Sequence, residues 1–239
     1  METMEMQHQV MGYDRSTLFS PDGRLLQVEY AQKTIRLGSA SIGIVCKDGV
    51  VIVADRRTKD VLIMPDSAMK VYEIDEHIIA SASGILSDAR ILIERAQLIA
   101  QQNKITYDSK IDVESVIKEI ADVKQQFTQY GGTRPFGVAI LIAGISGKKP
   151  RVYSSDVTGN YFAYKATAIG EQDEKIKEML RKRYDENMTV EDGIKTALEI
   201  FKEILGKNFS LDRFDVGYIK TEEIKIKKLS GDTLKKYVK

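Results

Sequence analysis

The chain is poor in the residues that build disulfide frameworks and metal centres. It has a single cysteine, Cys46, which excludes an internal disulfide and a cysteine-based metal cluster. Its only histidines are His8 and His77, so a histidine-rich metal site is excluded as well. We therefore expect neither a metal nor a cofactor.

Long apolar runs and an excess of one charge are also missing. No apolar run approaches the ~20 residues that cross a bilayer. The net charge is +1, so no overall field favours nucleic acid or an anionic membrane. The first residues, METMEMQHQVMG, have no basic n-region and no apolar h-region, unlike a signal peptide. We expect a soluble, cytoplasmic protein without nucleic-acid or membrane partners.

The length and composition of the chain predict one folded domain that follows a short N-terminal tail. With 239 residues, 43% hydrophobic and 30% charged, the chain can bury a substantial core. Residues 1–12 are polar and rich in methionine, without periodicity, which predicts a flexible tail. Residues 13–239 contain no linker and are expected to form a single domain.

Helices and strands are predicted in blocks. The predicted helices cover 21–37, 87–102, 113–127 and two further segments, the second of them ending near 205. The predicted strands cover 39–46, 50–55, 69–75, 77–83, 136–145, 151–157, 161–170, 214–220 and 223–229. Ser20 is expected to cap the first helix with Pro21 at its first position, Asp48-Gly49 to form a hairpin turn, and Thr189 with Asp192 to form a capping box.

This block order indicates a fold of the α+β class. Strands that come in groups, without strand–helix alternation, argue against a parallel doubly wound sheet. Two antiparallel sheets with a helix pair on each outer face would bury all the apolar stripes. The prediction is a four-layer α/β/β/α sandwich with an extra N-terminal helix, the architecture of N-terminal-nucleophile hydrolases.

A catalytic centre is one hypothesis for this architecture. In it the nucleophile heads the first strand, and the α-amino group freed by cleavage is the base. Ser39 heads that strand here, and Asp55 and Lys70 stand near the ends of the next two. Cleavage at Gly38-Ser39 would discard 38 residues that look structured, and without cleavage Ser39 has only an amide nitrogen. We therefore favour non-catalytic roles and keep the autoprocessed hydrolase as the alternative.

Several motifs carry a family resemblance that spans nearly the whole chain. They are GYDR and FSPDGRLLQVEYA near the N-terminus, DEHIIASASGILSDAR in the middle, then QQFTQYGGTRPFGVAILIAG and YKATAIG. With these the chain resembles the α-type subunit of the proteasome core particle, in its archaeal form. The resemblance implies a heptameric ring of α subunits that caps the β rings, restricts access to their proteolytic chamber and docks ATPase activators in ATP-dependent protein degradation. It leaves open a stand-alone binding domain, which would be monomeric.

The resemblance also implies that the chain is not proteolytic by itself. Catalytic β-type subunits have a free N-terminal threonine where Ser39 stands. They also have a Ser-Gly pair where this chain has Glu171-Gln172. The chain would then be a non-catalytic component of a threonine-type endopeptidase complex, through which unfolded protein substrates pass.

Three sets of site residues follow from the resemblance. The gate set is Tyr13, Asp14, Arg15, Pro21 and Tyr30, which would hold the tails of the ring open. The activator pocket contains Lys70 and Gly84, and would bind the carboxylate of a C-terminal hydrophobic–tyrosine–any-residue tail. The annulus that admits unfolded chains contains Tyr130, Gly131, Gly132, Thr133 and Arg134, where Arg134 is expected to fix the loop's shape.

One departure from the family pattern lies beside the gate set. Relatives usually have four residues between the arginine that matches Arg15 and the pair that begins at Phe19. This chain has three, 16–18. In a short extended connection, one residue fewer reverses the side to which side chains point, so we expect the tail to leave the ring at a different angle.

A ring also needs apolar surface between its subunits. The helix predicted over 21–37 is apolar enough to supply it, and we expect it to face a neighbour in the ring.

Overall fold

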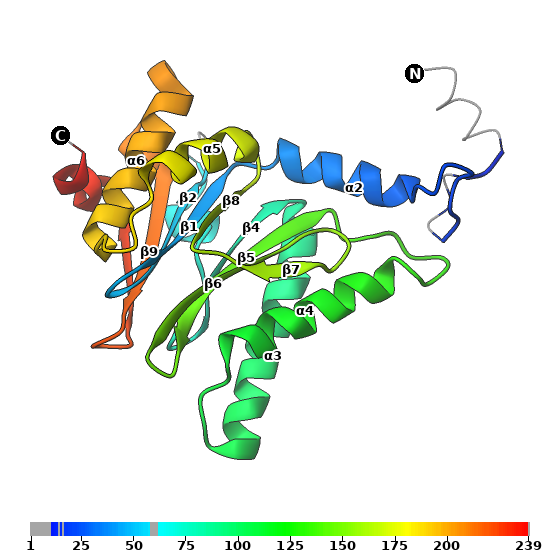
Figure 1. The fold of residues 1–239 in the computed structure, drawn as a ribbon, viewed down its shortest axis with the longest axis horizontal. Coiled ribbons are helices and arrows are strands. Elements are labelled where there is room, and N and C mark those ends of the chain that lie inside the picture. The colour runs from blue at the N-terminus through cyan, green and yellow to red at the C-terminus, as the bar shows by residue number, and fades with distance from the viewer. Residues whose placement is uncertain (1–10, 14, 16, 58–61, 239) are drawn as a thin grey trace.

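The computed structural model of the chain describes residues 11–13, 15, 17–57 and 62–238 (Figure 1). Helices and strands come in the predicted blocks. The helices are α2 (Leu26–Leu37), α3 (Leu86–Tyr107), α4 (Val113–Phe127), α5 (Asp173–Arg183) and α6 (Val190–Leu205). The strands are β1 (Ser41–Cys46), β2 (Gly49–Asp55), β3 (Tyr72–Asp75), β4 (Ile78–Gly84), β5 (Val138–Ser146), β6 (Lys149–Ser155), β7 (Tyr161–Ala163), β8 (Ala166–Ile169), β9 (Phe214–Lys220) and β10 (Ile226–Ser230).

The strands form two antiparallel sheets. One sheet has the order β10-β9-β2-β1-β8 and the other the order β3-β4-β5-β6-β7. Helices α5 and α6 cover the outer face of the first sheet, and α3 and α4 cover that of the second (Figure 1). The predicted four-layer α/β/β/α sandwich is confirmed.

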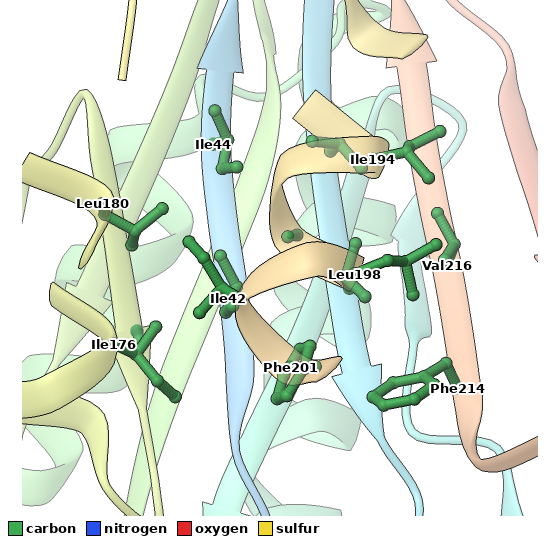
Figure 2. Packing of buried hydrophobic residues seen from close by; sticks show 14 of the residues in the cluster. Ile42, Ile44, Ile176, Leu180, Ile194, Leu198, Phe201, Phe214 and Val216 are labelled. Carbon is green, nitrogen blue, oxygen red and sulfur yellow. The ribbon is translucent and has the colours of Figure 1, made fainter. Parts of the chain in front are cut away.

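The apolar stripe of α6 shows why this layer forms. Ile194, Leu198 and Phe201 recur at helical spacing and are fully or almost fully buried. They belong to one cluster with residues of β1 and β9, and Figure 2 shows the Phe201 ring beside that of Phe214 of β9. Removing such apolar area from water contributes roughly 25 cal/mol per Å², so this layer is held mainly by the hydrophobic effect.

A further core lies between the two sheets and continues into α2. Strand β2 is buried along its whole length, as its run of apolar residues predicts for a strand covered on both faces. Val28, Ala31 and Ile35 of α2 join this inter-sheet cluster. Helix α2 therefore closes one end of the sandwich, directly before the chain enters β1 (Figure 1).

The predicted start of the first helix is wrong by five residues. Helix α2 begins at Leu26, and Pro21 lies in a preceding turn. The Ser20 hydroxyl donates to the Asp22 carboxylate at 2.5 Å and accepts the Arg24 N–H at 3.1 Å. Because Ser20 closes this turn, it does not cap the helix.

Two strand predictions are corrected by the way the chain turns. The strand predicted over 161–170 is two strands, β7 in one sheet and β8 in the other, so the chain crosses between the sheets there. The hairpin between β1 and β2 pairs Cys46 with Gly49, so its two-residue loop is Lys47-Asp48 rather than Asp48-Gly49.

Apolar surface also lies elsewhere than expected. The apolar stripe of α2 faces the inside of the chain, because Leu26, Val28, Ala31 and Ile35 are buried. Large exposed apolar side chains lie instead before α2, at its last residue, within the β2–β3 connection and at the first residue of α3: Phe19, Leu37, Leu62, Ile63, Met64 and Leu86.

Candidate functional site

Ser39 lies between the end of α2 and the start of β1. Its carbonyl accepts the Ser83 hydroxyl at 2.9 Å, which ties this junction to β4. Gly38 has no room for a side chain, because a Cβ there would lie 2.3 Å from the Gly84 nitrogen. The close backbone approach places Ser39 beside the end of β4.

Lys70 contacts both Ser39 and Asp55, the other two residues of the catalytic hypothesis. Its Nζ contacts both the carbonyl and the hydroxyl of Ser39, the hydroxyl at 2.5 Å, and donates to the Asp55 carbonyl at 3.3 Å. The side chain is buried rather than solvated. Burial lowers the pKa of the Lys70 amine to about 7, although the nearby Asp55 carboxylate favours the charged form.

The Asp55 carboxylate is directed elsewhere. Its Oδ2 accepts Arg213 Nη2 at 2.6 Å and its Oδ1 accepts Arg213 Nε at 3.1 Å, a bidentate pair. Its Oδ1 also accepts the Arg57 backbone N–H at 2.9 Å. The three residues of the hypothesis therefore meet through the Lys70 amine, while the carboxylate is committed to Arg213.

Sequence reasoning missed the second buried carboxylate of this site. Asp215 of β9 accepts the Lys70 backbone N–H at 2.8 Å, and its Oδ1 stands 3.4 Å from Arg56 Nε. Burial raises the pKa of Asp215 despite these donors. A lone aspartate in the otherwise apolar start of the strand segment FDVGYIK was the signal that could have found it.

A groove opens in front of this cluster. It has a volume of about 660 Å³, and both predicted pocket residues, Lys70 and Gly84, line it. Its wall combines cationic and apolar side chains, Arg56, Arg57, Ile63, Met69, Tyr72 and Leu86. Such a lining suits an extended peptide that ends in a carboxylate.

Gly84 has a steric reason to be glycine. Its φ is +125°, and a Cβ there would lie 2.1 Å from the Gly137 carbonyl oxygen. The tight approach joins the end of β4 to the start of β5, and it leaves the Gly84 backbone open toward the groove.

The loop predicted as an annulus lies between α4 and β5. Tyr130 is exposed, and nothing stands within 4 Å of a Cβ placed on Gly131 or Gly132. The Thr133 hydroxyl donates to the Tyr130 carbonyl at 2.8 Å.

Arg134 anchors the base of this loop. Its guanidinium donates to both oxygens of Asp88 at 2.7 and 2.8 Å, and the Gly137 N–H donates to the same carboxylate at 2.9 Å. Burial raises the pKa of Asp88, but the hydrogen bonds from Arg134 and Gly137 outweigh it and hold the pKa below its usual range. The contact ties the base of the loop to the start of α3, and the role of Arg134 in fixing the loop's shape stays a prediction.

The gate set is described only in part. Asp14 lies outside the described residues, as do residues 1–10 of the predicted tail. Tyr13 and Tyr30 are half-buried, and Arg15 is exposed. Pro21 lies in the turn before α2, and the Lys33 ammonium stands 5.4 Å from the centre of the Tyr30 ring. The open-gate cluster stays a prediction.

Glu171 and Gln172 follow β8 beside the same junction. The Glu171 N–H donates to the Gly38 carbonyl at 2.8 Å, and its carboxylate pairs with Arg57. Gln172 has a φ of +57° and precedes the first residue of α5. A bulky charged residue thus occupies the position at which the resemblance leads us to expect a serine in catalytic β-type subunits.

Neither a metal site nor a membrane span is found within the described residues. No group of three or more histidine, cysteine, aspartate or glutamate side chains is arranged to hold a metal ion there. No helix in that part of the chain is long and apolar enough to cross a membrane.

Comparison with known proteins agrees with this arrangement. The family model for proteasome subunits matches residues 35–219, and the model for the N-terminal signature of the A-type proteasome subunits matches residues 13–33. The chain is 44% identical to the proteasome alpha subunit of Archaeoglobus fulgidus, over 95% of this chain and 93% of that protein.

Two further relatives give the same picture. The proteasome alpha subunit of Methanococcus maripaludis (strain C7) is 45% identical over 95% of this chain and 88% of its own length. That of Methanosarcina acetivorans is 43% identical over 95% and 93%. With the N-terminal signature, the sandwich fold and these identities together, the chain belongs to the proteasome subunit family, as one of the alpha type similar to those of archaea.

Proposed function

We propose that this chain is a non-catalytic α-ring subunit of a proteasome core particle. Seven copies would form a ring that gates substrate access to the β-ring proteolytic chamber and docks ATPase activators in ATP-dependent degradation. The observation that carries the proposal is the place of α2, whose buried stripe belongs to the inter-sheet core directly before Ser39. Partners would be the other α subunits, the β subunits, an activator and unfolded proteins in transit, all in the cytoplasm.

The non-catalytic assignment is supported by the free energy that would be lost if the bond before Ser39 were cleaved. Release of a free amine at Ser39 would remove Val28, Ala31 and Ile35 from the core. Exposing several such side chains costs roughly 1.5–3 kcal/mol for each large one. The Asp55 carboxylate is also committed to Arg213, which supports a structural rather than a catalytic use of this cluster.

Docking of an activator tail is supported by the groove. A C-terminal carboxylate needs a cation and backbone donors. Lys70, Arg56 and Arg57 supply cationic groups along the groove, Gly84 leaves its backbone open, and Ile63 with Leu86 offers apolar contact. Lys70 and Ser39 both line the groove, so the carboxylate would approach the Lys70 amine from there.

The docking proposal is tested with a labelled peptide that ends in hydrophobic–tyrosine–any-residue. Lys70→Ala should weaken its binding, measured by fluorescence anisotropy, by roughly tenfold or more, since a charge-assisted hydrogen bond contributes about 1.5–3 kcal/mol. Lys118→Ala, which removes an exposed lysine of α4, is the matched control. Equal affinity of the two variants would remove Lys70 from the pocket.

The gate proposal is tested in the assembled particle. Deleting residues 1–12 should raise the rate at which added β subunits hydrolyse a peptide, because the tails would no longer fill the axial pore. A rate that the deletion leaves unchanged would argue against a gating role for the tail.

The ring itself is tested by native mass spectrometry, followed by denaturation of the same sample. A heptamer, or two stacked heptamers, of full-length chains is the expected result. A chain that starts at Ser39 would replace the proposal with an autoprocessed hydrolase. An intact monomer, even after β subunits are added, would contradict the ring.

A further inference from the structure

Arg57 differs from the other cations that line the groove. Within the part of the chain that the structure describes, these are Arg56 and Lys70. The Arg56 side chain is only 13% exposed, and its Nε stands 3.4 Å from the Asp215 carboxylate. Lys70 is buried against Ser39. The Arg57 side chain is 42% exposed, so its guanidinium is the groove cation that is most accessible to a carboxylate arriving from solvent.

This guanidinium already holds a carboxylate of the chain itself. Arg57 pairs with Glu171, which follows β8, and its Nη1 donates to the Leu37 carbonyl at 3.3 Å. The Glu171 side chain is 47% exposed, so water can replace the guanidinium as its partner at little cost in free energy. Arg57 is therefore occupied, but by a partner that is easily displaced.

The backbone around Glu171 is fixed, so only its side chain can move away. A Cβ on Gly170 would lie 2.5 Å from the Ser83 hydroxyl oxygen, which shows how tightly this backbone is packed. The Glu171 N–H donates to the Gly38 carbonyl at 2.8 Å, and α5 begins shortly after it. Because the backbone is held on both sides, the carboxylate stays within reach of Arg57 and can re-form the pair when the groove is empty.

A second carboxylate at Arg57 would compete with this one. A guanidinium binds a carboxylate best through two parallel N–H groups, and its Nη2 is already paired with Glu171. Two carboxylates at one guanidinium also repel each other. A peptide that ends in a carboxylate must therefore displace Glu171 to gain the full bidentate contact.

We propose that Glu171 is an internal competitor of the peptide carboxylate for Arg57, and that it thereby sets the affinity of the groove. This inference rests on the activator docking proposed above. When the hydrophobic–tyrosine–any-residue tail docks, its terminal carboxylate takes over the Arg57 guanidinium and Glu171 turns to solvent. Lys70 adds its charge from beside Ser39, as the docking proposal requires.

The test measures binding of the labelled peptide to the purified full-length chain by fluorescence anisotropy. Glu171→Gln keeps the size of the side chain and should tighten binding about two- to fivefold, the range that an exposed ion pair gives. Glu174→Gln is the matched control, because it removes the same charge nearby, from an exposed pair with Arg36. It should leave the affinity unchanged.

Two further measurements show whether Glu171 acts through Arg57. Arg57→Gln should weaken binding, and adding Glu171→Gln to it should have no further effect, since both residues act through one contact. A peptide with an amidated C-terminus has no carboxylate to compete with Glu171. It should bind the unmodified chain and Glu171→Gln with equal affinity, a comparison that does not depend on the folding of any Arg57 variant.

The outcomes separate this inference from the docking proposal. If Lys70→Ala weakens binding but Glu171→Gln binds like the unmodified chain, or gains no more than Glu174→Gln, docking stands and the inference is wrong. A gain by Glu171→Gln that persists with Arg57→Gln or with the amidated peptide would also overturn it. A peptide that binds neither the unmodified chain nor any variant would overturn both proposals together.

Discussion

Two buried lysines of this chain meet almost the same partners in different surroundings. Lys70 contacts the carbonyl and hydroxyl of Ser39 and the carbonyl of Asp55. Lys124 of α4 contacts the carbonyl and hydroxyl of Ser155 and the carbonyl of Asp156, the last at 2.6 Å. Burial lowers the pKa of both amines to about 7.

In neither place does the amine bind the carboxylate of its aspartate. Asp55 gives its carboxylate to Arg213, and Asp156 gives its own to the N–H groups of Thr158 and Asn160. Lys124 is closed in the core, whereas Lys70 lines a groove. A lowered pKa thus reports burial of the amine in both places, and the two sites differ in that only Lys70 lines a groove.

The largest loss of stability should come from replacing the tightly packed glycines in the segments around each lysine. Gly84→Ala and Gly159→Ala should each destabilise the chain by about 3 kcal/mol or more, because φ is positive at both and a Cβ would lie 2.1 and 2.3 Å from a carbonyl oxygen. Urea denaturation measures the loss.

Gly147→Ala is the matched control for these two variants. Its φ is +61°, but nothing lies within 4 Å of an added Cβ, so only the backbone cost of about 1–2 kcal/mol applies. If all three variants lose equal stability, the close carbonyl contacts are not what requires glycine at Gly84 and Gly159.

The next effect should come from the ion pair that keeps Asp55 away from Lys70. Arg213→Met should cost about 3 kcal/mol, because it leaves a buried carboxylate without its cation. Stability is followed by urea denaturation.

Arg183→Met removes a more exposed ion pair, to Glu203, and should cost less than about 1 kcal/mol. Were Arg213→Met no more costly than this control, the pair with Asp55 would be dispensable, and the contrast between the two lysine sites would rest on access alone.

Replacing the lysines should reveal how each contributes to stability as pH changes. Both folded-state pKa values, about 7, lie below the unfolded value of about 10.4. Between these values the unfolded chain binds more protons, so each lysine makes stability rise with pH from about 7 to about 10. Below pH 7 the cost of burying the charge is fully present.

Lys124→Met should therefore flatten this rise, with a relative gain near pH 7 of about 2 kcal/mol that disappears by pH 10. Lys70→Met should flatten it to a similar extent, because burial lowers the pKa of that amine as far. Lys118→Met, on the same helix as Lys124 but exposed, should leave the rise unchanged. Denaturation curves at pH 7 and 10 measure all three. A rise that Lys70→Met leaves unchanged would contradict the lowered pKa of Lys70.

Much of the fold was readable because its signals are local. Helical spacing and strand grouping gave the four layers, and the capping box at Thr189 is present. The start of α2 was predicted too early because a serine such as Ser20 can either cap a helix or close a turn. The residues themselves do not decide between the two, and in the structure Ser20 closes a turn. The crossing of 161–170 between sheets is likewise set by packing and not by the segment's own residues.

The site was predictable only as far as strand ends could place it. Convergence of Ser39, Asp55 and Lys70 follows from strand order, but the partner of Asp55 is Arg213, 158 residues further along the chain. Lys124 did carry a signal, since it lies four residues after buried Ile120 on the apolar stripe of α4. A charged residue on such a stripe needs a buried partner, and the sequence does not show which carbonyls provide it.

The smallest expected effect distinguishes the helix that carries Lys124 from the capped helix α6. Thr189 and Asp192 bond reciprocally at the start of α6, so Thr189→Ala should cost about 1 kcal/mol in urea denaturation. Asp112 precedes α4 without a side-chain cap hydrogen bond. Asp112→Ala should then cost only about 0.3–0.5 kcal/mol, through the helix dipole. A loss at Asp112 equal to that at Thr189 would mean that Asp112 caps α4 in solution, and that the position of Lys124 is held from the helix end as well as from the turn at Asp156.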